Sequence, residues 1–343
     1  MIPKLKHLVI KPDLRCTARC PTCSRRRDLH AQTRKQRLLT FREWEDVLAE
    51  ARQLGVRNFD ISGGEPTLYR DLPALIRLGR QHGWVVQLNS NGSRMPDSEI
   101  RKLLGAGLDR VMISIYSHEA DIHDAMRGLP GLWEKATAAL AGWASQKACQ
   151  SGLEVIAQTL LCPENLMQLP DLLRLLKRLG ADGVVLSYLE GNFEGAEVFS
   201  PQLLKCFDGQ VRVELLRLCR EWRWPASLLA RRQLGRLFSP RHLPLEYWAT
   251  GLYHRVQPSC PEPSRMALIL ANGDVHPCNV VEYTHEPVMG NLFEASLASI
   301  WQSDSWQAFR QHGHPQCRRC PMMHQSFVPF EPPRWAVLRR RWF

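Results

Sequence analysis

The chain has 343 residues, of which 44% are hydrophobic, and a formal net charge of +11. This length is enough for about two domains with apolar cores. The longest uncharged apolar run, MALILA at 266–271, falls far short of the ~20 residues that a membrane-spanning helix needs. The N-terminus also lacks an apolar stretch long enough for a secretory signal. We therefore expect a soluble, cytoplasmic protein without a membrane partner.

Cysteine content and charge narrow the class further. Eleven cysteines, an odd number, argue against a disulfide framework and favour thiolates that serve as ligands. The positive charge lies in short arginine clusters such as 25–27 and 339–341, which are typical of a solvated surface. Because no aromatic and basic strand pattern of an RNA-binding module accompanies them, nucleic acid is not an expected partner.

Apolar segments alternate with amphipathic helical segments from residue 6 to about 190. Several of the helical segments, for example 41–55 and 71–83, end in a glycine that can cap the helix. Six strand–helix repeats predict a curled parallel sheet. The expected strands are 7–11, 56–62, 85–91, 110–117, 153–161 and 183–190.

The expected strands are polar on one side. In the second strand, for example, Asn58 and Asp60 alternate with Phe59 and Ile61. A parallel sheet covered by helices on both faces is apolar on both. The pattern therefore predicts a partial (β/α)6 barrel over residues 1–190 with a polar lumen, and it disfavours a closed barrel filled with aliphatic side chains.

Three cysteines, Cys16, Cys20 and Cys23, follow the first strand within eight residues. Their spacing fits neither a pair of C-x-x-C zinc hooks nor a thioredoxin-like pair. Three thiolates can hold three irons of a cubane and leave the fourth iron open, and an open metal position is what catalysis requires. The segments SGGEPTLY and NSNGS follow the next two strands, at the end of the sheet where parallel α/β folds place active sites.

The C-terminal part carries a second set of cysteines after a helix-rich connector expected at 191–255. Its segment LANGDV is expected to form a hairpin turn. Four thiolates can close a metal site completely, and this chemistry alone fits zinc as well as iron. The four, in the region expected to form a small domain over 256–343, are Cys260, Cys278, Cys317 and Cys320.

Together these motifs resemble the radical SAM enzymes, which cleave S-adenosylmethionine at a [4Fe–4S] cluster to make a 5′-deoxyadenosyl radical. The family's C-x₃-C-x₂-C signature matches the first cysteine set, and HDAMRG at 123–128 resembles a stretch of the branch with a SPASM or shorter twitch domain. That domain's opening pattern matches Cys260, Gly273 and Cys278, and its C-x-x-C matches the last two cysteines.

The resemblance implies cofactors and contacts. The first cysteine set would hold a [4Fe–4S] cluster with an open iron, and the second one auxiliary [4Fe–4S] cluster. A full SPASM domain has further cysteines where this chain has Ser326 and Phe330, so one auxiliary cluster is expected rather than two. The residues implied in S-adenosylmethionine binding are Gly63, Gly64, Glu65, Ser90, Asn91, Ser114 and Arg127.

The paired glycines would let the backbone approach the methionine moiety closely. Glu65 would accept a hydrogen bond from its ammonium group, and Arg127 would pair with its carboxylate. An ordinary tight turn and an ordinary surface pair are the structural alternatives for these residues.

The expected reaction is hydrogen-atom abstraction from a small polar substrate, a carbohydrate, aminocyclitol or similar specialised metabolite, followed by epimerisation or dehydrogenation. The alternative is radical modification of a ribosomally made peptide. A more remote alternative is a non-catalytic iron–sulfur or zinc protein that binds nucleic acid. An electron donor such as flavodoxin or ferredoxin is an implied partner.

Cys162 stands apart from both cysteine sets, at the C-terminal end of the fifth expected strand. Its parity with Gln158 predicts that its side chain points into the lumen. A thiol at that place could return a hydrogen atom to a substrate radical, as an epimerase requires. The alternative is that Cys162 is a buried packing residue at the barrel rim.

Overall fold

The computed structural model describes residues 2–23, 37–189, 199–239, 243, 245–251, 253–254, 259–279, 287–321 and 324–331. One mixed sheet of ten strands organises these residues, in the order β10-β6-β5-β4-β3-β2-β1-β7-β8-β9. Its first six strands are β1 His7–Lys11, β2 Asn58–Ile61, β3 Val85–Ser90, β4 Arg110–Ser114, β5 Glu154–Leu161 and β6 Gly183–Tyr188.

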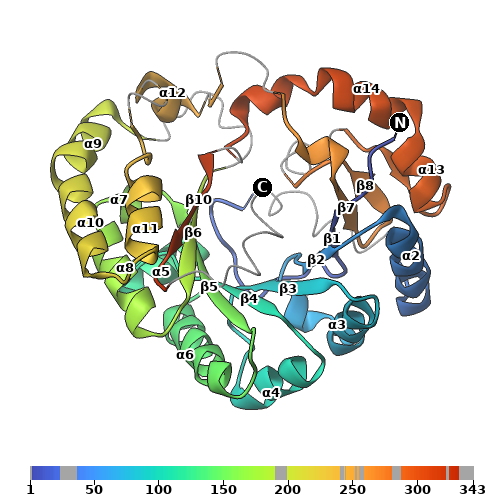
Figure 1. The fold of residues 1–343 in the computed structure, drawn as a ribbon, viewed down its shortest axis with the longest axis horizontal. Coiled ribbons are helices and arrows are strands. Elements are labelled where there is room, and N and C mark those ends of the chain that lie inside the picture. Colours follow the sequence, from blue (N-terminus) through green and yellow to red (C-terminus); the bar gives the residue numbers. More distant parts are fainter. Residues whose placement is uncertain are drawn as a thin grey trace.

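These six strands are parallel throughout, which confirms the predicted curled α/β sheet. The helices that follow them line the outside of the curve in Figure 1. Among the described residues, no helix is both long and apolar enough to span a membrane. The helices of this half are α2 Phe41–Leu54, α3 Leu72–Gln81, α4 Asp97–Gly105, α5 Ala120–Arg127, α6 Leu132–Ser145, α7 Pro163–Leu166 and α8 Leu169–Arg178.

Local sequence signals explain where helix α2 begins and ends. Thr40 and Glu43 form a reciprocal capping box at its N-terminus. Gly55 ends it in the left-handed conformation, with φ of 103°, as the glycine pattern predicted. Trp44 and Ala51, seven residues apart on one face, are fully buried against the sheet. The apolar faces of helices and strands together form the main core.

The inner face of the sheet carries a row of polar side chains across β1 to β5, as the alternation predicted. His7 lies 3.1 Å from Asp60, which accepts a hydrogen bond of 3.0 Å from Gln87. Arg110 donates to Gln87 at 3.2 Å and pairs with Glu154. Burial opposes the charged form of His7, but Asp60 outweighs it and raises the pKa of His7. These side chains link five neighbouring strands, and all but Asp60 lie in the N-terminal half of their strand, away from the end that carries the cysteine loop.

The C-terminal part continues the same sheet on both sides. β7, Met266–Leu270, pairs parallel with β1, and β10, Ser326–Pro329, pairs antiparallel with β6. β8, Asp274–His276, returns from β7 through the predicted turn and pairs with the short β9, Gly290–Asn291. The expected domain boundaries at 190 and 255 lie outside the described residues and stay predictions.

Six helices of six to nine residues complete the described portion of this part. Ser326 lies within β10 and Phe330 follows it, both buried, so the two positions that lack cysteine hold the edge strand in place. The helices are α9 Pro201–Cys206, α10 Arg212–Leu218, α11 Ala226–Leu234, α12 Leu245–Thr250, α13 Leu297–Gln302 and α14 Asp304–His312.

Candidate active site

The loop that carries the first cysteines lies directly against the loop after β2. The amide of Gly64 donates to the carbonyl of Asp13 at 3.1 Å, and the amide of Glu65 donates to that of Arg15 at 2.8 Å. A Cβ on Gly64 would stand 2.1 Å from the Arg15 carbonyl oxygen, and one on Gly63 would stand 2.3 Å from that of Asp13. The paired glycines therefore allow close contact between two backbones of the chain itself.

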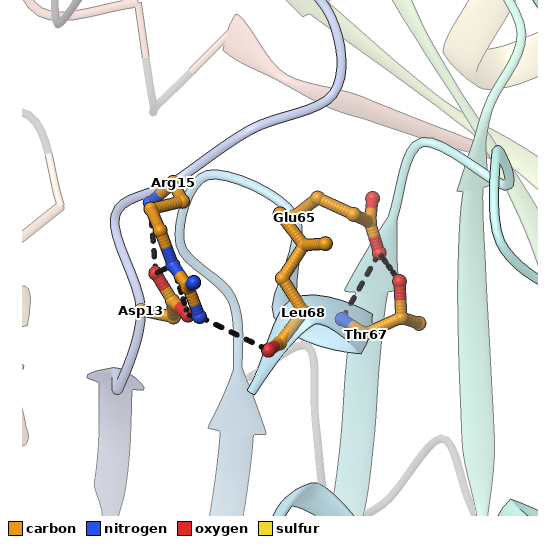
Figure 2. Close-up of polar contacts among 5 residues, drawn as sticks. All are labelled: Asp13, Arg15, Glu65, Thr67 and Leu68. Carbon is orange, nitrogen blue, oxygen red and sulfur yellow. Dashed lines mark hydrogen bonds and ion pairs between the residues drawn. The ribbon is translucent and has the colours of Figure 1, made fainter. Parts of the chain in front are cut away.

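An ion pair reinforces this contact, as Figure 2 shows. The Arg15 guanidinium donates to both carboxylate oxygens of Asp13 and also to the carbonyl of Leu68, at 3.2 Å. Asp13 is nearly buried, whereas the Arg15 side chain is largely exposed. The pair ties the residue before Cys16 to the short helix η2, Pro66–Leu68, that follows Glu65.

The carboxylate of Glu65 is completely buried and ties the same loop to the end of β3. One oxygen accepts from the Ser90 hydroxyl at 2.8 Å and from the hydroxyl and amide of Thr67 at 2.7 and 3.2 Å. The other oxygen accepts from the amide of Asn91 at 2.8 Å. Glu65 thus binds chain groups in this structure, and its contact with a methionine ammonium group stays a prediction.

Asn91 extends this network into the cysteine loop. Its side-chain amide donates to the hydroxyl of Thr17 at 3.0 Å and lies 3.7 Å from the sulfur of Cys16. The Cys16 sulfur also accepts from the amide of Ala18, at 3.4 Å. The end of β3 and the cysteine loop are therefore joined through polar side chains, which the SNG motif alone did not reveal.

Helix α5 clamps the loop from its other side. The amide of Arg19 donates to the carbonyl of Arg127 at 3.0 Å. A Cβ on Gly128, which caps α5 with φ of 60°, would stand 2.3 Å from the Arg19 carbonyl oxygen. The segment HDAMRG thus places an arginine and a glycine where they meet the cysteine loop.

Arg127 is buried, with only 7% of its surface exposed, and its guanidinium carbon lies 4.5 Å from the ring centre of Tyr116. Its Nε has no hydrogen-bond partner among the described residues. A buried guanidinium with an unused donor is suited to bind a carboxylate. Arg127 therefore fits the predicted role at the methionine carboxylate of S-adenosylmethionine.

Tyr116, whose ring lies beside Arg127, is held by His123 and Asn165. The sequence analysis did not single out either residue. The Tyr116 amide donates to Nδ1 of His123 at 3.0 Å, and its carbonyl accepts from the Asn165 side chain at 2.8 Å. Burial lowers the pKa of His123 to about 4, so the imidazole is neutral and can accept through Nδ1. The motif that contains His123 was visible in the sequence, but its contact with Tyr116 was not.

Ser114 and Cys162 differ in their placement. Ser114 ends β4 on the same side of the strand as Met112, whose side chain belongs to the inner apolar cluster. Cys162 is 2% exposed and packs in the main core. Ile156, six residues earlier and therefore on the same side in a regular strand, lies in the inner cluster instead. Because β5 ends at Leu161 and Cys162 caps α7, the strand alternation does not fix the direction of this side chain, and its lumen orientation stays a prediction.

The environment of Cys162 favours the neutral thiol. Burial raises the pKa of its thiol to about 12. Its backbone amide donates to the side chain of Asn165 at 2.9 Å, as the capping residue of α7. The packing interpretation of Cys162 accounts for these contacts.

Each cysteine set contains a backbone turn between two of its cysteines. The amide of Cys23 donates to the carbonyl of Cys20 at 3.1 Å, and that of Cys320 donates to Cys317 at 3.2 Å. Cys260 lies close enough to Cys317 for the two thiolates to repel. Over the described ranges, the side chains as placed bring no three histidine, cysteine, aspartate or glutamate residues within reach of one metal ion.

The donor chemistry of both sets nonetheless fits iron–sulfur clusters. Cysteine thiolates are the usual ligands of such clusters. Here one short loop supplies three of them, and the segment 260–320 supplies four. Burial raises the pKa of the Cys16, Cys260 and Cys317 thiols, which bound iron would reverse because coordinated thiols are deprotonated.

Comparison with known proteins agrees with this geometry. The sequence model of the radical SAM superfamily matches residues 12–176. The model of the SPASM iron–sulfur cluster-binding domain matches residues 260–321. The first match spans the cysteine loop, the Glu65 network and α5, and the second contains all four C-terminal cysteines.

Two curated relatives extend over nearly the whole chain. A PqqA peptide cyclase of Rhizobium meliloti (strain 1021) is 27% identical over 95% of this chain and 80% of its own length. A PqqA peptide cyclase of Streptomyces rochei is 27% identical over 92% of this chain and 82% of its own length.

Among solved structures, SuiB of Streptococcus suis bound to S-adenosylmethionine has a TM-score of 0.64 at 16% identity, covering 99% of this chain and 74% of that one. This likeness shows a shared fold. A second SuiB structure with the same score contains the precursor peptide SuiA.

These relatives correct the expected substrate. The prediction of a carbohydrate or aminocyclitol that is epimerised or dehydrogenated is wrong, because the curated relatives are named for a peptide and their similarity spans the whole chain. The polar lumen misled the prediction, since polar strand ends serve a peptide as well as a sugar. Hydrogen donation by Cys162 depended on epimerisation and loses its basis with it.

Cysteine chemistry alone left zinc and iron open at the C-terminal set, and the family match decides for iron. The matching domain there is an iron–sulfur cluster-binding domain, not a zinc ribbon. The cofactors are therefore S-adenosylmethionine, a [4Fe–4S] cluster and an auxiliary iron–sulfur cluster, and the remote alternative of a non-catalytic protein is excluded. This chain belongs to the radical SAM superfamily of enzymes, in the branch that carries a C-terminal SPASM domain.

Proposed function

We propose that this enzyme uses radical chemistry to modify a ribosomally made peptide by forming a covalent bond within it. The observation that carries the proposal is the extent of similarity to the two peptide cyclases, 95% and 92% of this chain. The similarity therefore includes the connector and the C-terminal cysteines, which lie outside the superfamily match at 12–176. A match confined to the barrel would support only the shared cofactor chemistry.

We assign roles to the site residues on the contacts described above. Cys16, Cys20 and Cys23 hold the catalytic cluster, in a loop clamped between the Gly64 backbone and Gly128. Arg127 binds the methionine carboxylate through its unused donor. The remaining contacts to S-adenosylmethionine come from Gly63, Gly64, Glu65, Ser90, Asn91 and Ser114, and the ligands of the auxiliary cluster are Cys260, Cys278, Cys317 and Cys320.

S-adenosylmethionine and the catalytic cluster, when bound and reduced, supply the radical that removes a hydrogen atom from the peptide. The chain's part is to fix geometry, because radical chemistry requires the reacting carbon to be held in place and water to be excluded. The buried Glu65 network and the clamped loop provide that rigidity. A protein electron donor, flavodoxin or ferredoxin, stays the predicted source of the electron.

The test uses the anaerobically reconstituted holoenzyme with S-adenosylmethionine, a reductant and the short peptides encoded beside its gene. Formation of one bond within a peptide removes two hydrogen atoms, so one peptide is expected to lose their mass while 5′-deoxyadenosine accumulates. Mass spectrometry measures the loss, and fragmentation locates the new bond. Cys20→Ala serves as the inactive control. Accumulation of 5′-deoxyadenosine with every such peptide unchanged would contradict the proposal.

A further inference from the structure

Exposed apolar side chains gather on the connector helices. Trp224 is 75% exposed, Leu228 60% and Val213 54%, and these are the three most exposed large apolar residues among the described ranges. All three lie between the start of α10 and the middle of α11. Large apolar side chains that gather on an otherwise polar surface commonly mark a binding site.

The same segment is strongly basic. Residues 212–236 contain seven arginines and two glutamates, a net charge of +5 out of +11 for the whole chain. Arg212 and Arg217 pair with acidic neighbours. The other five form no ion pair with a residue that the structure describes, and these are Arg220, Arg223, Arg231, Arg232 and Arg236.

Helix α11 presents both kinds of side chain on its outward face. Its buried face consists of Ala226, Ala230 and Leu234, which follow one another at intervals of four residues. Leu228 lies on the opposite face, and Arg231 and Arg232 follow it three and four residues later, so the three are neighbours. Figure 1 shows α11 beside the edge strand β10, with α10 at the outer rim.

The exposed tryptophan lies just before α11, next to its capping residue Pro225. Trp224 precedes Leu228 by four residues, and the helical hydrogen bonds already start at the carbonyl of Arg223, which accepts from the Ser227 amide at 3.0 Å. We name the α11 surface by its members, which are Arg220, Arg223, Trp224, Leu228, Arg231 and Arg232. It consists of an apolar centre with arginines at both ends.

We propose that the α11 surface binds an acidic segment of the peptide substrate, one with large apolar side chains between aspartates or glutamates. The inference rests on the proposed function and adds where the peptide is recognised outside the reaction site. Unpaired arginines complement acidic groups, and a tryptophan with a leucine beside it supplies the buried centre that dominates binding energy in such interfaces.

The position of the surface favours the substrate over other occupants. It lies between the matched regions 12–176 and 260–321, in a part of the chain that neither family model covers. A second copy of this chain would bring two surfaces together that each carry four arginines, which electrostatic repulsion opposes.

The experiment measures binding to the reconstituted holoenzyme by fluorescence anisotropy. The probe is a labelled 16-residue peptide of glutamate, leucine and phenylalanine, compared with its lysine counterpart and with a 16-nucleotide single-stranded DNA. Charge reversal at Arg231→Glu with Arg232→Glu is expected to weaken binding of the acidic peptide about tenfold at low salt. Trp224→Ala is expected to weaken it about tenfold at any salt concentration.

The matched control reverses two exposed arginines elsewhere, Arg77→Glu in α3 and Arg101→Glu in α4, which changes the net charge equally. This variant should bind the acidic peptide within about twofold of the parent protein. All variants should retain the parent rate of S-adenosylmethionine cleavage with dithionite, which shows that they fold and load their clusters.

Equal losses in the surface and control variants would overturn the inference, because the effect would then be one of net charge. Tighter binding of the DNA than of the acidic peptide would also overturn it, as would a dimer that Trp224→Ala dissolves. The binding measurement needs no peptide modification. Failure of the proposed function would therefore appear as unchanged peptide masses, with the binding result still standing for an acidic polypeptide.

Discussion

The two cysteine sets are held in place by different means. The first lies in one short loop that packs in backbone contact with Gly63, Gly64 and Gly128, where any side chain would clash. The second is spread over residues 260–320. Its assembly depends on sheet pairing, because β7, which lies between Cys260 and Cys278 in the sequence, pairs with β1. The first set therefore has its cysteines together in one loop that the surrounding backbone holds in place, whereas the members of the second come together only when the sheet has formed.

Gly64→Ala is expected to damage the first cysteine site more than any other single change, because this site depends on backbone packing. The new methyl group would meet the carbonyl oxygens of Arg15 at 2.1 Å and Leu14 at 2.5 Å, and neither backbone can move without displacing the cysteine loop. We expect a loss of about 3 kcal/mol in the free energy of unfolding and little S-adenosylmethionine binding. Chemical denaturation and calorimetric titration measure the two.

The matched control for that change is Gly105→Ala. Gly105 ends α4 with no atom within 4 Å of an added Cβ and with no positive φ. Alanine there should leave stability unchanged or raise it by up to about 1 kcal/mol, because it restricts the unfolded chain. Equal damage from both substitutions would refute the packing argument.

A smaller effect is expected from Glu65→Gln. The buried carboxylate accepts four hydrogen bonds, and the amide of glutamine would turn a donor toward at least one of the donors that it faces. A loss of about 2–3 kcal/mol in unfolding free energy and weaker S-adenosylmethionine binding should follow. Glu134→Gln, at an exposed position of α6, is the comparison, and an unchanged Glu65→Gln protein would argue against the network.

The pH dependence of stability provides the next test of the first site. Because the pKa of His123 is lowered to about 4, the folded protein disfavours the charged imidazole, whereas the unfolded chain takes up the proton near pH 6.5. His123 therefore reduces stability as the pH falls below about 6.5, by about 2 kcal/mol between pH 7 and pH 5. His123→Gln should flatten this part of the profile, and identical slopes in both proteins would contradict the assignment.

The sequence predicted the sheet, the polar lumen and both cysteine sets because each depends on local spacing. The alternation of Asn58 and Asp60 with Phe59 and Ile61 carries its own signal of a half-polar strand. Long-range contacts left no such signal. The pairing of His7 with Met266 joins β1 to a strand 259 residues away, and that of Leu186 with Ser326 joins β6 to a strand 140 residues away.

The same distinction applies to single residues. The lumen orientation predicted for Cys162 extends the alternation one residue beyond the end of β5. The sequence predicts that Gly63 and Gly64 admit a ligand, but it contains no sign that they also admit the backbone of Asp13 and Arg15. The substrate could not be derived, since polar groups in a lumen do not distinguish a sugar from a peptide.

The central claim is that the first cysteine set alone forms the site of S-adenosylmethionine cleavage and that the second is separate from it. The most direct measurement is the release of 5′-deoxyadenosine, with dithionite as reductant, by Cys20→Ala and Cys317→Ala proteins reconstituted in parallel. We predict no release from Cys20→Ala, together with retained auxiliary-cluster iron, and release at a rate close to the parent enzyme from Cys317→Ala. Cleavage by Cys20→Ala at the parent rate, or its complete loss in a folded Cys317→Ala protein, would contradict the account.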